Sequence, residues 1–165
     1  MPWIKGAAGA IALAFAGLFA LPAAAQTVYD PLSTSDLTQL LKSLGHDSTV
    51  EPSDDDFEGD YVTIKYGAVS YWIHFTACDE DGTDCEVIVF DAGFSYNEKS
   101  ERPDLTKIND WNEYHLGKAG IDKGGDPFIN IEVNVVGGIT RTNLVDTITW
   151  WQDMVDEFTD YVGWG

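Results

Sequence analysis

Two cysteines carry the clearest chemical signal in this sequence. Cys78 and Cys85 enclose an acidic hexapeptide that lies between two strand-like runs. A redox-active pair is more typical of a C-x-x-C motif at a helix N-terminus, where the helix dipole lowers the pKa of a thiol. An even number of cysteines in an exported chain instead predicts one structural disulfide, here closing a hairpin loop.

The hexapeptide also contains carboxylates that could bind calcium. Asp79, Asp81 and Asp84 are spaced like part of a calcium-binding loop. However, the glycine stands at the fourth position of the loop instead of the sixth, and no glutamate stands at the twelfth. A solvated hairpin loop is the favoured interpretation, and weak calcium binding stays open as the alternative.

Catalytic motifs are missing from the sequence. It contains no G-x-S-x-G motif, and the glycine pairs at 124–125 and 137–138 lack the surroundings of a phosphate loop. With 28 Asp and Glu residues, some carboxylate pair always looks suitable for acid–base chemistry, so such a pair indicates little. The histidines are too far apart to form the close pairs of a zinc site: His46, His74 and His115. We therefore expect no catalytic residue, metal or cofactor, and an uncharacterised periplasmic hydrolase using acidic residues is the alternative.

The aromatic residues fall into two groups. Trp111 and Trp151 lie on the expected core faces of two helices. A second group lies beside the main apolar stripe of the last helix, beyond the helix, or on the opposite face of a strand. This second group either widens the core or forms a surface for a partner protein. The candidate residues of that surface are Trp72, Trp150, Met154, Tyr161 and Trp164.

The charge of the chain restricts its partners. The sequence has 28 acidic and 9 basic residues, which gives a net charge of −19 and a pI near 4.1. Nucleic-acid binding needs clustered Lys and Arg, and docking on anionic lipid needs the same, so both are disfavoured. Hydrophobic residues make up 44% of the chain and aromatic residues 13%, which indicates one folded domain and excludes a disordered acidic chain.

The N-terminus has the pattern of a secretory signal. Lys5 precedes an uncharged apolar run over residues 11–21, Pro22 breaks the helix, and the alanines at 23–25 offer a cleavage site between Ala25 and Gln26. We expect a signal peptide over 1–25 and a mature domain over 26–165, located in the periplasm of a Gram-negative bacterium or secreted. Cleavage removes one base and no acid, so the mature charge is −20. An uncleaved membrane anchor is the alternative, because residues 6–27 carry no charge.

Hydrophobic periodicity predicts three helices and six strands. Ser33 and Thr140 are candidate helix caps, and Pro103-Asp104 opens a helix whose apolar side is expected to carry Leu105, Ile108 and Trp111. The predicted order is α-β-β-β-β-α-β-β-α, which is an α+β fold with an antiparallel sheet flanked by helices. The expected helices begin near residues 34, 104 and 141, and the expected strands are near 49–51, 61–66, 69–76, 86–94, 118–122 and 128–135.

Several segments form a combined pattern: the run over 105–112, the segment 118–122, Gly125-Asp-Pro127, Gly137-Gly-Ile139, the paired cysteines before Phe90-Asp-Ala-Gly-Phe94, and a final helix that carries Trp. Together they resemble the YbjN-like family. The resemblance implies a fold similar to type III secretion chaperones, which often pair into dimers. Family members are described as sensory transduction regulators, and the family supplies no agreed catalytic residues. We therefore expect a non-enzymatic protein that binds an unknown protein partner, or a second copy of itself, and no membrane after cleavage.

Overall fold

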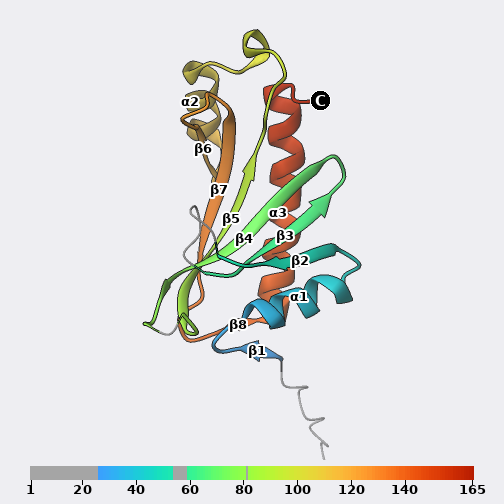
Figure 1. Cartoon of the computed structure of the whole chain (residues 1–165), viewed down its shortest axis with the longest axis vertical. Helices are drawn as coiled ribbons and strands as arrows, with labels where there is room; N and C mark the ends of the chain where they lie inside the picture. The colour runs from blue at the N-terminus through green and yellow to red at the C-terminus, as the bar shows by residue number, and fades with distance from the viewer. Residues whose placement is uncertain (1–25, 54–58, 81) are drawn as a thin grey trace, which may run out of the picture.

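The computed structural model describes residues 26–53, 59–80 and 82–165, and the signal-peptide prediction lies outside these residues. Figure 1 shows a sheet with helices packed against it. The elements are β1 (Val28–Tyr29), α1 (Thr34–Ser43), β2 (Asp47–Glu51), β3 (Tyr61–Tyr66), β4 (Val69–Cys78), β5 (Cys85–Gly93), the 3-10 turn η1 (Lys99–Glu101), α2 (Leu105–Tyr114), β6 (Lys118–Ile121), β7 (Pro127–Asn134), β8 (Ile139–Thr140) and α3 (Arg141–Val162).

The predicted α+β fold with an antiparallel sheet is confirmed. Six strands form one antiparallel sheet in the order β2-β3-β4-β5-β7-β6. The strands β1 and β8 form a separate two-stranded sheet, which the sequence analysis did not predict. Each of these two strands has only two residues, too few for an alternating pattern to be recognised.

The helix starts follow the predicted caps. The hydroxyl of Ser33 accepts the backbone N–H of Asp36 at 3.1 Å, and the Asp36 carboxylate accepts the Ser33 backbone N–H at 3.3 Å, which together form a capping box. Thr140 caps α3 by accepting the N–H of Asn143 at 3.2 Å, and Asp104 caps α2 in the same way. These bonds satisfy N–H groups that the first helical turn leaves without partners.

One predicted core position is wrong. Ile108 and Trp111 of α2 are buried, but Leu105, which we expected on the same apolar side, is 65% exposed. Leu105 is the first residue of α2, directly after the capping Asp104, so it lies at the end of the helix where the apolar stripe no longer meets a neighbouring element.

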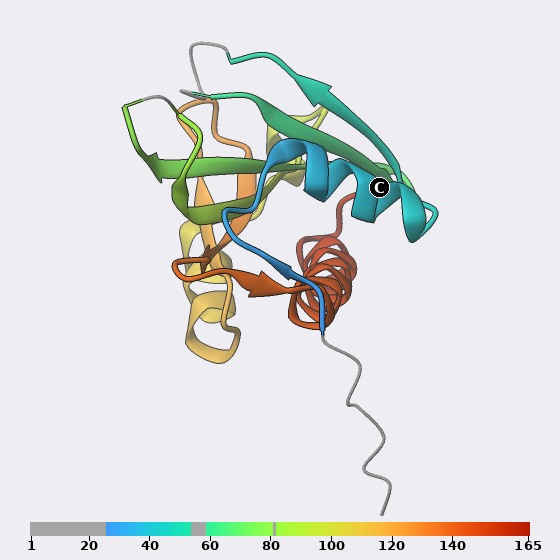
Figure 2. The same ribbon diagram turned by 90° about the horizontal axis from the view of Figure 1, so that it is seen from below.

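The helices share one face of the sheet. Figure 2 shows α1 and α3 on the same side of the strands. The buried stripe of α3 and the leucines of α1 form one core cluster with the inner face of the strands. At its centre, the ring of Trp151 lies 6.0 Å from Tyr71 and 5.8 Å from Phe90, measured between ring centroids. The predicted burial of Trp111 and Trp151 is confirmed, since both are fully buried.

The other face of the sheet carries a cross-strand row of mostly polar residues. Thr63, Trp72, Asp91, Asn130 and Lys118 are paired in turn across β3, β4, β5, β7 and β6. We call this the outer face. Within the described ranges, no helix is both long enough and apolar enough to cross a membrane.

Candidate functional site

Three exposed apolar side chains gather where α2 ends. Tyr114 is 76% exposed, Leu116 is 86% exposed and Trp150 on α3 is 43% exposed. Leu116 and Trp150 line two adjoining hollows. Exposing several large apolar side chains to water at one place is unfavourable, so such a group is typical of an interaction surface.

The two hollows differ in which elements form them. The first, which we call the edge hollow, has a volume of about 320 Å³ and is lined by Leu116, Lys118, Asn130, Ile131, Glu132, Val133 and Trp150. The second, the helix hollow, has a volume of about 190 Å³ and is lined by Tyr114, His115, Leu116, Trp150, Asp153, Met154 and Glu157.

His115 fixes the segment that carries Tyr114 and Leu116. Its ring stacks on Trp111, with 3.6 Å between ring centroids and 2° between planes. Its Nδ1 lies 3.0 Å from the Trp111 carbonyl oxygen, and its Nε2 lies 3.1 Å from Oε1 of Glu157 on α3. One ring nitrogen thus contacts an oxygen within α2 and the other contacts a carboxylate on α3. The end of α2 is therefore attached to α3.

Gly117 brings the chain into close contact with α3. A Cβ atom at this position would lie 2.4 Å from Sδ of Met154, which is closer than atoms can pack. Met154 is itself buried, so it forms the floor under this segment instead of part of an exposed surface. The side chain of Asn112 then holds the next strand, accepting the N–H of Ala119 at 2.7 Å and donating to its carbonyl oxygen at 3.0 Å.

Carboxylates outnumber basic groups around the hollows. Glu132 lines the edge hollow together with the ammonium of Lys118, and Asp153 and Glu157 line the helix hollow together with the imidazole of His115, which contacts Glu157. The site thus combines an apolar floor with an acidic rim. A partner with apolar residues flanked by Lys or Arg complements both features.

The five candidate surface residues lie in different places. The structure brings Trp150 and Met154 together in the helix hollow. Tyr161 packs against Trp111 and donates its hydroxyl to the Lys107 carbonyl oxygen at 3.0 Å.

The other two candidates lie elsewhere in the fold. Trp164 packs on Phe94 and donates its indole N–H to the Ser95 carbonyl oxygen at 2.9 Å. Trp72 is half-buried on the outer face, next to Asp91 in the adjacent strand. Trp164 is therefore held in local packing by its own contacts, and Tyr161 is held in the same way by its contacts with Trp111 and Lys107.

Sequence reasoning missed Tyr114 and Leu116. Both stand near the end of a helix pattern, and the sequence analysis assigned neither of them to the core or to a surface. The available signal was the step from the helix end to the strand at Lys118, which leaves only His115, Leu116 and Gly117 between them. A connection this short holds its side chains close to both elements, but the sequence does not reveal which of them point to solvent.

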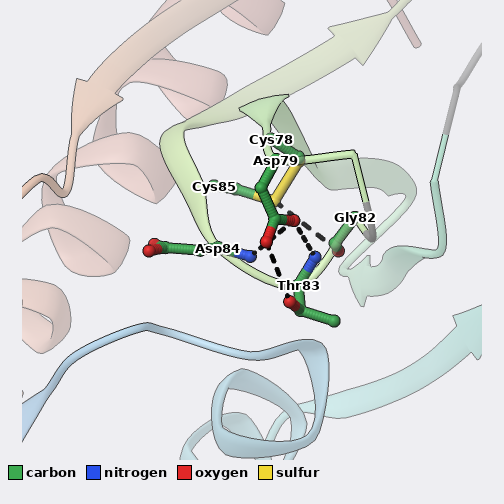
Figure 3. The surroundings of a disulfide bond; sticks show 6 residues. All are labelled: Cys78, Asp79, Gly82, Thr83, Asp84 and Cys85. Carbon is green, nitrogen blue, oxygen red and sulfur yellow. Dashed lines mark hydrogen bonds between the residues drawn. A yellow bond between two sulfur atoms is a disulfide. The ribbon is translucent and has the colours of Figure 1, made fainter.

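The disulfide loop is a separate feature, shown in Figure 3. Cys78 and Cys85 are joined with an S–S distance of 2.07 Å, as predicted. The Asp79 carboxylate accepts the backbone N–H groups of Thr83 at 2.8 Å and Asp84 at 3.2 Å, and these bonds lower the pKa of Asp79 below its usual value. Asp79 thus organises the hairpin turn itself.

The hairpin offers little support for a ligand site. The calcium interpretation also involves Asp81, which lies outside the described residues. Among the residues that are described, no group of three or more His, Cys, Asp or Glu side chains could hold a metal ion. A polar hollow of about 670 Å³ lies between this hairpin and the start of α1, where Ser33 and Asp36 already cap the helix.

One known protein family matches most of the chain. The family YbjN, described as "Putative bacterial sensory transduction regulator", matches residues 33–164. The chain belongs to the YbjN family. The matched range of the YbjN domain includes every residue of both hollows and the disulfide. A search of curated proteins found no match.

Proposed function

We propose that this YbjN protein is an exported, non-enzymatic regulator that acts by binding another protein through the edge hollow and the helix hollow. The observation that carries the proposal is the group of exposed apolar residues, Tyr114, Leu116 and Trp150, held in place by His115 and Gly117. The family description as a regulator of sensory transduction supports a binding role.

Export is part of the same proposal. The N-terminal pattern of the sequence is that of a signal peptide cleaved before Gln26. The disulfide between Cys78 and Cys85 is consistent with an oxidising compartment such as the periplasm. Intact-mass measurement of the protein from its host tests this point: loss of residues 1–25 supports export, and a full-length chain with free thiols contradicts it.

Site-specific photo-crosslinking tests the binding role. A photoreactive residue is placed at Leu116 in one variant and at Leu105 in a control variant, and both are expressed in the native host. Both leucines are strongly exposed, but only Leu116 lines the hollows. We expect the same protein to be captured reproducibly from Leu116 and not from Leu105. Capture of identical proteins from both positions, or of none, would contradict the proposal.

A further inference from the structure

We infer that the edge hollow binds an extended, basic segment of the partner protein, which adds as a strand to the open edge of β7. The inference rests on the proposed function, since it states which kind of partner segment the same surface accepts. It depends on three features of the described residues: an unpaired strand edge, a hollow that follows this edge, and an acidic rim.

The edge of β7 is open beyond Asn130. The strand β6 pairs with β7 only from Ile121 opposite Pro127 to Lys118 opposite Asn130, whereas β7 continues to Asn134. No other described strand pairs with this side of β7. An unpaired edge of this kind presents backbone donors and acceptors that another chain can use.

The backbone groups that face the open side can be assigned from the register. The Val135 N–H donates to the Glu86 carbonyl oxygen at 2.8 Å, and the Phe94 N–H donates to the Pro127 carbonyl oxygen at 2.9 Å. In antiparallel pairing such bonds occur at every second residue, so the odd-numbered residues of β7 face β5. The N–H and C=O of Glu132 therefore point to the open side.

The edge hollow follows the strand edge. Asn130 and Glu132 share the outer face of β7, whereas Ile131 and Val133 point to the helix side, and all four line the hollow. A hollow lined from both faces of one strand lies beside that strand. An occupant of the hollow runs along the edge and places its alternate side chains above and below the sheet, as a strand does.

The segment before β6 keeps this edge open. Close packing of Gly117 on Met154 and the attachment of His115 to Glu157 direct the chain toward α3, and pairing with β7 begins only at Lys118. Leu116 is left exposed at the border of the hollow. The apolar residues of an added strand can contact Leu116, Val133 and Trp150 there.

Charge selects among the occupants of the hollow. Glu132 and Lys118 line the edge hollow itself, and Asp153 and Glu157 line the adjoining helix hollow together with His115, so acidic side chains exceed basic ones over the two hollows. A segment that alternates apolar residues with Lys or Arg complements this rim. A second copy of this chain, with its net charge of −19, would instead bring one acidic rim against another.

Amide hydrogen exchange with a model peptide tests the inference. The probe is a short acetylated and amidated peptide in which lysines alternate with valines, added to the disulfide-bonded protein. We expect the peptide to slow exchange of the Glu132 amide at least tenfold, with little change at Ile131, whose amide already faces β5. Binding that leaves the Glu132 amide unprotected would contradict strand addition and leave the proposed function intact.

Matched peptides separate backbone pairing from charge. N-methylation of the alternate peptide amides that face β7 should weaken binding at least tenfold, because it removes donors and keeps the charge. Replacing every lysine with glutamate should abolish binding. Equal affinity of the N-methylated and unmodified peptides would overturn the inference, as would concentration-dependent dimerisation of the protein through Leu116.

Substitutions in the protein, instead of in the peptide, provide a second test of the inference. Glu132→Pro removes the N–H that faces the open edge, which a strand tolerates where that N–H has no partner. It should abolish peptide binding, whereas Glu132→Gln should weaken it only a few-fold. Leu116→Ser should weaken binding at least tenfold and Leu105→Ser should not. Full binding by both Glu132→Pro and Leu116→Ser would overturn the inference.

Discussion

Asp91 places an ionisable carboxyl in the middle of the sheet, which is unusual. It lies on the outer face of β5, half-buried, with Nδ2 of Asn130 at 3.4 Å. Burial raises the pKa of this carboxyl above its ordinary value of 3.8, and the Asn130 hydrogen bond and the charge of Lys118 only partly oppose that shift. Because the folded-state pKa is raised, the ionised carboxyl is less favourable in the folded protein than in the unfolded chain at neutral pH.

Asp91→Asn should therefore raise the free energy of unfolding at pH 7. In the unsubstituted protein, the free energy of unfolding rises as pH falls through the raised folded-state pKa of Asp91, because the buried carboxyl becomes neutral. The difference in free energy of unfolding between the variant and the unsubstituted protein should therefore shrink, and it should disappear below pH 3.8. Urea unfolding at several pH values measures both curves. Asp110→Asn on the exposed side of α2 is the control, and an equal gain in that variant would contradict a specific cost at Asp91.

Two adjacent tryptophans of α3 should behave differently on truncation. Trp151 is fully buried in the core, so Trp151→Ala should lower the free energy of unfolding by about 3–5 kcal/mol. Trp150 is 43% exposed and lies outside the buried core, and Trp150→Ala should cost less than about 1 kcal/mol while weakening partner binding. Denaturant titrations of both variants check this. A large stability loss in Trp150→Ala would argue for a packing role instead of a binding role.

At the scale of elements, the disulfide hairpin joins β4 and β5 in the middle of the sheet. Replacing both Cys78 and Cys85 with serine releases an eight-residue loop. Loop-closure entropy predicts a loss of about 2.5 kcal/mol in the free energy of unfolding, seen by chemical denaturation. Since none of the described hairpin residues lines either hollow, peptide binding should be retained. Loss of binding in the folded variant would contradict this separation.

Much of the fold could be predicted from the sequence, since local rules decide it. Ser33, Asp104 and Thr140 mark helix starts because their side chains bond the first free N–H groups. Alternation in β3, β4 and β7 follows from one face being buried. These signals require no knowledge of distant contacts.

The site could be predicted only in small part. Trp150 stood out as an aromatic beside the main stripe, but its neighbours Leu116 and Val133 come from elements that only the fold brings together. The open edge of β7 depends on where β6 begins pairing, which is decided by the packing of Gly117 on Met154. No local pattern reports that contact, and the exposure of Leu105 was misjudged for the same reason.

For the whole molecule, the excess of acidic residues is the dominant property. Most of the charged groups are exposed, and a net charge of −19 favours hydration of the surface and exerts an attraction on basic molecules over distances set by ionic strength. The charge is therefore relevant to partner choice as well as to solubility.

Binding of the lysine–valine peptide should depend on salt. The dissociation constant should rise at least threefold between about 50 mM and 500 mM NaCl, because the ions screen the acidic rim. Fluorescence anisotropy of a labelled peptide measures it. A serine–valine peptide is the control and should bind weakly at both concentrations. Affinity independent of salt would contradict the contribution of Glu132, Asp153 and Glu157.

The most direct test of the account is selection of binding peptides from a random library displayed on phage. The disulfide-bonded protein is immobilised, and selections are repeated with Leu116→Ser and with Leu105→Ser. We expect enrichment of segments that alternate Lys or Arg with apolar residues, retained on the Leu105→Ser variant and lost on the Leu116→Ser variant. Enrichment of acidic segments, or of basic segments that still bind Leu116→Ser, would contradict it.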